Sequence, residues 1–165
     1  MPTKLRRVVT INDAKGKAVI SSDSIVESQP ARSGSPVHVC NLWMSDGAPP
    51  TLNGPDALQQ PIPMLPVPKG ATFRMMEIGA GTPPHMHRTE TLDYIIVFEG
   101  ELDMFLDDGA KVHLKEGDIM IQRGTMHGWA NPGDKPCRFA TVIIDGGVRL
   151  FEESINEINN SRQSL

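Results

Sequence analysis

Short runs of β-prone residues, separated by turn-forming residues, recur along most of this 165-residue chain. The 15 glycines and 14 prolines are many for this length, which favours frequent turns over long helices. Strands at roughly 8- to 12-residue spacing are typical of an antiparallel sandwich or barrel, so the sequence predicts an all-β fold. The predicted strands after Gly70 cover residues 72–78, 93–98, 101–106, 111–114, 119–122 and 138–144.

The chain is long enough for one domain, with four predicted regions. Residues 1–45 hold β-prone runs that we expect to pair with the barrel or with a second subunit. Residues 46–70 are rich in proline and glycine and lack a sustained period, which predicts a connecting loop. Residues 71–146 form the predicted barrel core. Residues 147–165 are expected to form a short C-terminal helix and a polar tail, because apolar residues recur there at helical spacing.

Charge and apolar patterning exclude several classes of partner. The net charge of −4 and the pI near 5.7 give no attraction to phosphate backbones or anionic lipid, so no nucleic-acid or membrane partner is expected. No apolar run near the start is long enough for a signal peptide core or a membrane span. We therefore expect a cytoplasmic protein. Cys40 and Cys137 lie far apart in the sequence and are interpreted as two reduced, packed thiols.

Two of the five histidines, His85 and His87, stand on either side of Met86. On an extended backbone residues i and i+2 point to the same face, so both imidazoles can address one point. His127 comes forty residues later, after a predicted strand and turn. In an antiparallel barrel the two segments can lie side by side and offer three imidazoles to one divalent metal ion. Zn, Fe, Ni, Mn and Cu all accept such ligands, so the identity of the metal stays open.

The other two histidines, His38 and His113, have no such neighbours in the sequence. We interpret both as ordinary surface or hydrogen-bonded side chains.

The segment around the histidine pair resembles the first sequence motif of the cupin superfamily. Five residues separate Gly79 from His85, and Gly100 closes the segment. The family pattern has Glu three or four residues after the second histidine, whereas the nearest carboxylates here are Glu90 and Asp93. Counting back from Gly100 selects Asp93 as the candidate fourth ligand, with a side chain about 1.5 Å shorter than that of Glu.

A second segment resembles the second cupin motif. Gly117 is followed by Gly124, His127 and Asn131, with two departures from the family pattern: Gln122 stands where the family usually has Pro, and the distance from Gly117 to that position is one residue shorter. The two motifs together cover about a third of the chain and are specific for the fold rather than for a reaction. The resemblance implies a small single-domain cupin, a jelly-roll β-barrel with an N-terminal strand extension, and a homodimer that pairs through its N-terminal strands.

Alternation along the strands selects candidates for the substrate pocket. If His127 points into the barrel, Trp129 does too, with Met126 beside them. On the strand before the first motif, either Arg74 or Glu77 enters the cavity, because the two have opposite parity. The candidates for proton transfer are Glu90, Asp93 and Tyr94.

A metal held by neutral imidazoles keeps its full charge and open coordination positions, which suit a carbonyl, carboxylate or enolate oxygen. The leading hypothesis is a metal-dependent lyase that acts on a small carbonyl compound by decarboxylation, dehydration or another elimination. The alternatives are a ferrous dioxygenase of the cupin type and a non-catalytic small-molecule-binding cupin. Retention of three histidines speaks against the last, because an inward polar cluster must be satisfied.

Overall fold

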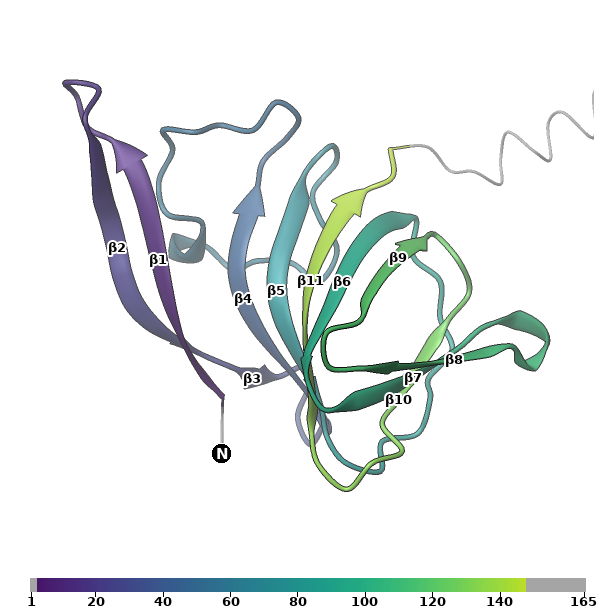
Figure 1. The fold of residues 1–165 in the computed structure, drawn as a ribbon. Helices are drawn as coiled ribbons and strands as arrows, with labels where there is room; N and C mark the ends of the chain where they lie inside the picture. The colour runs from purple at the N-terminus through teal and green to yellow at the C-terminus, as the bar shows by residue number, and fades with distance from the viewer. Residues whose placement is uncertain (1–2, 148–165) are drawn as a thin grey trace, which may run out of the picture.

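The computed structural model describes residues 3–147, which consist of strands, turns and two short 3-10 helices (Figure 1). The elements run in the order β1 (Lys4–Asn12), β2 (Ala18–Glu27), β3 (Gln29–Pro30), β4 (Val37–Ser45), η1 (Ala57–Gln59), β5 (Ala71–Ile78), β6 (Thr91–Glu99), β7 (Glu101–Phe105), η2 (Asp107–Gly109), β8 (Lys111–Lys115), β9 (Ile119–Arg123), β10 (Gly128–Ala130) and β11 (Cys137–Asp145). The predicted all-β fold is confirmed.

Two antiparallel sheets form the body of the protein. The larger sheet has the order β3-β4-β5-β11-β6-β9, and the smaller has the order β10-β7-β8. Figure 1 shows the smaller sheet beside the β6 and β9 end of the larger one, as in a jelly roll. Within the described residues the two sheets do not close into one continuous hydrogen-bonded barrel.

The hydrophobic core lies between these two sheets. On strand β6 the side chains alternate between this core and the outer face of the sheet. Ile95 and Val97 are buried, whereas Tyr94, Ile96 and Phe98 are 42, 48 and 41% exposed. This alternation places Asp93, Ile95 and Val97 on the inner face of β6. The buried core cluster consists of Ile78, Ile95, Val97, Leu102, Leu114, Cys137 and Phe139.

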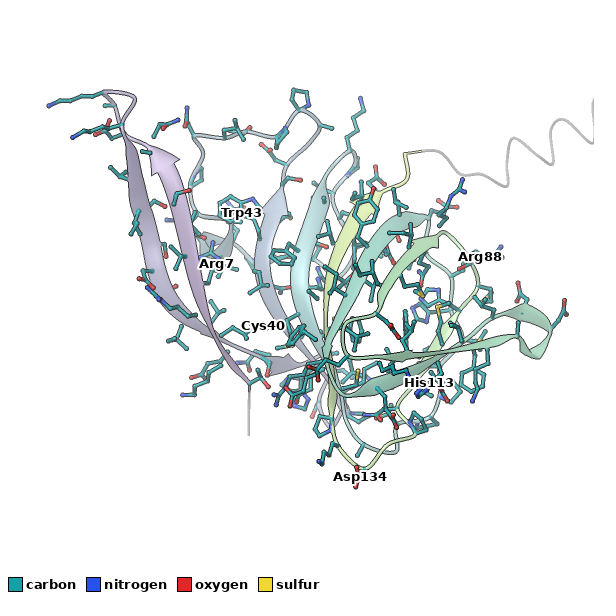
Figure 2. The ribbon with its side chains drawn as sticks, viewed as in Figure 1. Arg7, Cys40, Trp43, Arg88, His113 and Asp134 are labelled. Carbon is teal, nitrogen blue, oxygen red and sulfur yellow. The ribbon has the colours of Figure 1, made fainter. Side chains whose placement is uncertain are left out.

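Strands β1 and β2 form a hairpin that projects from the body, drawn in purple in Figure 1. In the described residues these two strands pair with each other and with no other strand. Side chains at its base attach it instead. The hydroxyl of Thr3 donates to Glu77 on β5 at 2.6 Å, and Arg7 forms an ion pair with Asp56. Figure 2 shows Arg7 and Trp43 lying between the hairpin and β4.

The connection from residue 46 to residue 70 contains only the short helix η1. The C-terminal helix predicted between residues 148 and 158 lies outside the described residues. Cys40 and Cys137 are buried free thiols, as the sequence predicted. No helix between residues 3 and 147 is long and apolar enough to cross a membrane.

Candidate metal site

The connection between β5 and β6, residues 79–90, carries His85 and His87 and is fastened at its start. Gly79 donates its backbone N–H to Pro36, and the Thr82 hydroxyl donates to the Gly79 carbonyl at 2.6 Å. The Thr82 carbonyl in turn accepts from the backbone N–H of Asn131 at 3.0 Å. These bonds hold the histidine-bearing connection against the segment that follows β10.

Asn131, the last residue of the second motif, has a structural role. Its side-chain amide donates to the carbonyls of Ile78 and Lys135 at 2.9 and 2.8 Å, and its oxygen accepts from the Gly133 N–H at 2.9 Å. The side chain is fully buried. A buried amide with its groups satisfied in this way ties the end of β5 to the turn before β11.

The histidines of the two motifs meet through their backbones. His87 donates its N–H to the carbonyl of His127 at 2.7 Å, and His127 donates to His87 at 2.9 Å. The pair forms an isolated antiparallel bridge, which places the two imidazole rings 4.2 Å apart between centroids. Segments forty residues apart in the sequence therefore converge here, as the motif spacing predicted.

Backbone carbonyls orient both rings. Nδ1 of His87 lies 3.0 Å from the His85 carbonyl, and Nδ1 of His127 lies 2.9 Å from the Thr125 carbonyl. A carbonyl only accepts, so in each neutral ring Nδ1 carries the proton and Nε2 keeps its lone pair. Fixing the tautomer by a hydrogen bond at the other nitrogen is the usual way in which proteins prepare a histidine to bind a metal.

His127 is the more enclosed of the two, with only 3% of its surface exposed. Burial lowers the pKa of its imidazole more than the hydrogen bond with the Thr125 carbonyl raises it, and the nearby His87 lowers it slightly further. The ring therefore favours the neutral form that metals require. The Trp129 ring lies edge-on to it at 6.0 Å and stacks on Phe139 of the core, so Trp129 faces inward as predicted.

Asp93 supplies a buried carboxylate on the inner face of β6. Its Oδ2 accepts from Nε2 of Gln122 at 3.0 Å, whereas its Oδ1 has no hydrogen-bond partner in the described part of the chain. Burial raises the pKa of this carboxyl, although the nearby Thr91 and His87 partly offset the effect. The carboxylate is therefore close enough to His87 for the two side chains to interact electrostatically.

The donor chemistry of this region fits a divalent metal, although residues 3–147 contain no group of three His, Cys, Asp or Glu side chains arranged to hold one. His87 and His127 each have a free Nε2, and Asp93 keeps an unpartnered buried oxygen. The exposed ring of His85 stacks on that of His87 at 6.0 Å between centroids. Two of the three predicted imidazoles are thus together, and the third is on the same short connection.

The structure corrects two of the other candidates. Tyr94 lies on the outer face of β6, opposite in parity to Asp93, and is 42% exposed, so it is not placed for proton transfer in the interior. Glu77 lies on the outer face of β5, where Thr3 and Arg138 bind its carboxylate and lower its pKa against the effect of burial. It therefore does not line the interior.

Of the two alternatives on β5, Arg74 is the inward one. It pairs with Thr141 in register and has the same parity as Ile78, which belongs to the core. The remaining candidates are less enclosed, since Glu90 is exposed and Met126 is half-buried.

A row of polar side chains runs along the inner face of the larger sheet, and sequence reasoning found Arg74 and Asp93 but missed its other members. The row crosses four strands, and each member has a buried atom without a hydrogen-bond partner in the part of the chain that the structure describes. The signal was available in the parity of each strand, since Gln122 lies directly opposite Asp93 in the register. The row consists of Asn41, Thr72, Arg74, Asp93 and Gln122.

The fold and the paired histidines define a small jelly-roll protein whose interior holds both an apolar core and a row of polar side chains. The cupin domain family matches residues 72–144. The phomopsin biosynthesis cluster protein C′ of Diaporthe leptostromiformis is 34% identical over 139 residues, which are 76% of this chain and 69% of that protein. The cupin-domain-containing oxidoreductase srdB of Neurospora crassa is 31% identical over 142 residues, 84% of this chain and 72% of that protein. The chain belongs to the cupin family.

Solved structures agree on the fold. The cupin domain of Schizosaccharomyces pombe Cnp3 gives a TM-score of 0.52 at 11% identity, covering 97% of this chain and 94% of that one. The Clostridium difficile EutQ protein gives 0.50 at 19% identity, covering 84 and 87%. Two of the relatives, srdB and fogC, are named cupin-domain-containing oxidoreductases, so this chain is similar to enzymes of the cupin type.

Proposed function

We propose that this chain is a metal-dependent enzyme that acts on a small oxygenated compound. Nε2 of His87 and Nε2 of His127 would bind one divalent metal, with His85 as the third imidazole and Asp93 as the candidate fourth ligand. The observation that carries the proposal is the backbone bridge between His87 and His127, which brings together two rings whose Nδ1 atoms are already engaged by carbonyls. A hydrogen bond at Nδ1 fixes the ring orientation and the tautomer in which Nε2 can bind a metal.

The chain's own residues support lyase chemistry at this site. A bound divalent metal would supply Lewis-acid polarisation of a carbonyl or carboxylate oxygen. If Asp93 does not ligate the metal, its Oδ1, which has no hydrogen-bond partner in the described residues, would accept or return a proton at a neighbouring carbon or hydroxyl. Gln122 holds the other carboxylate oxygen and so orients the group. Trp129 lies edge-on to the His127 ring and packs against the apolar core, so it would limit the access of water from that side.

A second candidate is an oxidoreductase. It is favoured by the names of the relatives, two of which are the cupin-domain-containing oxidoreductases srdB and fogC. With ferrous iron at the same histidines the chemistry would be that of a cupin dioxygenase. Oxygen consumption on adding iron and substrate separates this candidate from a lyase, which uses no oxygen.

Turnover by purified protein tests the proposal. Protein loaded with Zn, Fe, Ni, Mn or Cu is assayed for product from a panel of β-keto and β-hydroxy acids, and oxygen uptake is followed in parallel. We expect turnover with at least one metal and its loss in His127→Ala, while His113→Ala, which alters a histidine bound to Asp103 on the smaller sheet, keeps it. The non-catalytic alternative would be supported instead if a panel compound binds without turnover and with the same affinity to the metal-loaded and the metal-free protein.

We further propose that the chain forms a homodimer and works in the cytosol, where its two buried thiols stay reduced. The interface proposed here is the outer face of the larger sheet rather than the N-terminal strands, because that face carries a broad apolar surface and monomers rarely expose such patches. This surface consists of Phe73, Tyr94, Ile96, Phe98, Ile119 and Ile121. Light scattering after size exclusion is expected to give twice the mass of one chain and a single-chain mass for Ile121→Lys. A single-chain mass for the wild type contradicts the dimer.

A further inference from the structure

A cavity of about 410 Å³ lies apart from the histidines, between β3, β4, β5 and the proline-rich connection. Most of its lining is apolar and includes Val39, Leu58, Ile62 and Met64. Its polar lining includes Asn41 and Arg74 on the inner face of the larger sheet. A largely apolar cavity with a few convergent polar groups has the character of a small-molecule site.

Arg74 is the unusual member of this lining. It is 1% exposed, and no carboxylate of residues 3–147 lies within 4.0 Å of its guanidinium. Its Nη1 donates to the Met64 carbonyl at 3.0 Å and approaches the Met64 sulfur at 3.1 Å, and its Nη2 donates to the Pro63 carbonyl at 2.8 Å. Its Nε has no partner in this part of the chain. The buried guanidinium of Arg74 is therefore hydrogen-bonded only to neutral acceptors, whereas a buried cation ordinarily pairs with an anion.

The other polar groups around the cavity leave this charge uncompensated. Glu27 also lines the cavity, but its carboxylate is bound to Lys4 at 2.7 Å. Asn41 lies opposite Arg74 in the register, and its Oδ1 is buried without a partner among the described residues. Gln29 completes the polar lining and is neutral.

We propose that this cavity binds a small monocarboxylate with an apolar body, whose carboxylate pairs with Arg74. The guanidinium fork matches a carboxylate geometrically, and the carbonyls of Pro63 and Met64 hold the place that the ligand's oxygens take. Val39, Ile62 and Leu58 receive the apolar body. A single buried cation in an apolar lining balances one negative charge, which selects a carboxylate over a doubly charged phosphate.

Binding requires the segment around Met64 to move, because its carbonyl and sulfur now cover the guanidinium. That segment belongs to the connection 46–70, whose one regular element is η1. None of the cavity's lining residues is a histidine, so the site stands apart from the proposed metal chemistry.

Calorimetric titration with hexanoate, and with hexanamide as its neutral counterpart, tests the proposal on the full chain. We expect hexanoate to bind the wild type and hexanamide and inorganic phosphate not to bind. Arg74→Met is expected to weaken hexanoate binding at least about 10-fold, because it removes charge-assisted hydrogen bonds. Arg123→Met, which removes an exposed cation from β9, is expected to bind as the wild type does.

Two further variants keep the test decisive. Ile62→Trp fills the cavity while leaving Arg74 in place, and it is expected to abolish hexanoate binding. This variant therefore tests the proposal even if Arg74→Met fails to fold. His127→Ala is expected to keep hexanoate binding, which separates this site from the metal proposal. Equal binding of hexanoate and hexanamide, phosphate binding as tight as that of hexanoate, or no binding of hexanoate to the wild type would each overturn the inference.

Discussion

One of the contacts that attach the β1–β2 hairpin is a buried ion pair between Arg7 and Asp56, which Arg7→Met removes. Arg7 donates to both oxygens of Asp56 at 2.9 and 2.6 Å and to the Leu42 carbonyl at 2.7 Å, and its guanidinium lies 5.4 Å from the centroid of the Trp43 ring. The two charged side chains are only 7 and 21% exposed. Removing one partner of such a pair costs about 3 kcal/mol, the lower end of the range for buried pairs, since Asp56 retains some contact with water.

That cost is expected to appear as local opening of the hairpin. A loss of about 3 kcal/mol accelerates hydrogen exchange by roughly 100-fold where exchange proceeds through that opening. Mass spectrometry of exchanged peptides from β1 and β2 measures it. Arg6→Met is the matched control, because Arg6 forms the same kind of pair with Asp23 but the two side chains are 68 and 40% exposed. We expect little change there.

Acid is expected to erase the difference between Arg7→Met and the wild type. The hydrogen bonds from Arg7 lower the pKa of Asp56, with burial opposing them. The pair's contribution is therefore present above the unfolded-state value of about 4 and is lost as the pH falls through the lowered folded-state pKa. Equal exchange rates for Arg6→Met and Arg7→Met at neutral pH would refute the reasoning.

Three further predictions concern the interior. Burial raises the pKa of Asp93, so the stability linked to this group is present below about pH 4 and is lost as the pH rises through the raised folded-state pKa. In EDTA-treated protein we therefore expect Asp93→Asn to melt at a higher temperature than the wild type at pH 7, but not in acid. Gly100→Ala is expected to lower the midpoint of urea unfolding more than Gly117→Ala, because both positions have positive φ but a Cβ at Gly100 would lie 2.9 Å from the Pro136 carbonyl oxygen, whereas at Gly117 it would meet nothing within 4 Å. Burial raises the pKa of Cys137 to about 11 and also raises that of Cys40. A thiol reagent at pH 8 is therefore expected to leave the folded protein unmodified and to label two thiols per chain in urea. Labelling of the folded chain would contradict this burial.

The fold was predictable because strand spacing and parity are local properties of the sequence. Counting back from Gly100 selected Asp93, and the structure places this residue on the inner face of β6. The extent of β2 was not predictable, because Ser22, Asp23 and Ser24 are not β-prone and become a strand through pairing with β1.

The candidate site was predictable only in part. The motif spacing located His87 and His127, but not the backbone bridge that joins them. The sequence left Arg74 and Glu77 as alternatives because both parities of β5 carry apolar residues, so only the packed sheets decide which one faces inward. The contacts of Arg74 with Pro63 and Met64 were beyond prediction, since the connection 46–70 has no period from which its path follows.

The metal content of protein purified without added metal tests the proposed centre most directly. Elemental analysis is expected to find one divalent ion per chain in the wild type and in His113→Ala, and none in His127→Ala. Wild-type protein that stays metal-free after incubation with each of the five candidate ions, or a His127→Ala variant that keeps its metal, would contradict the account.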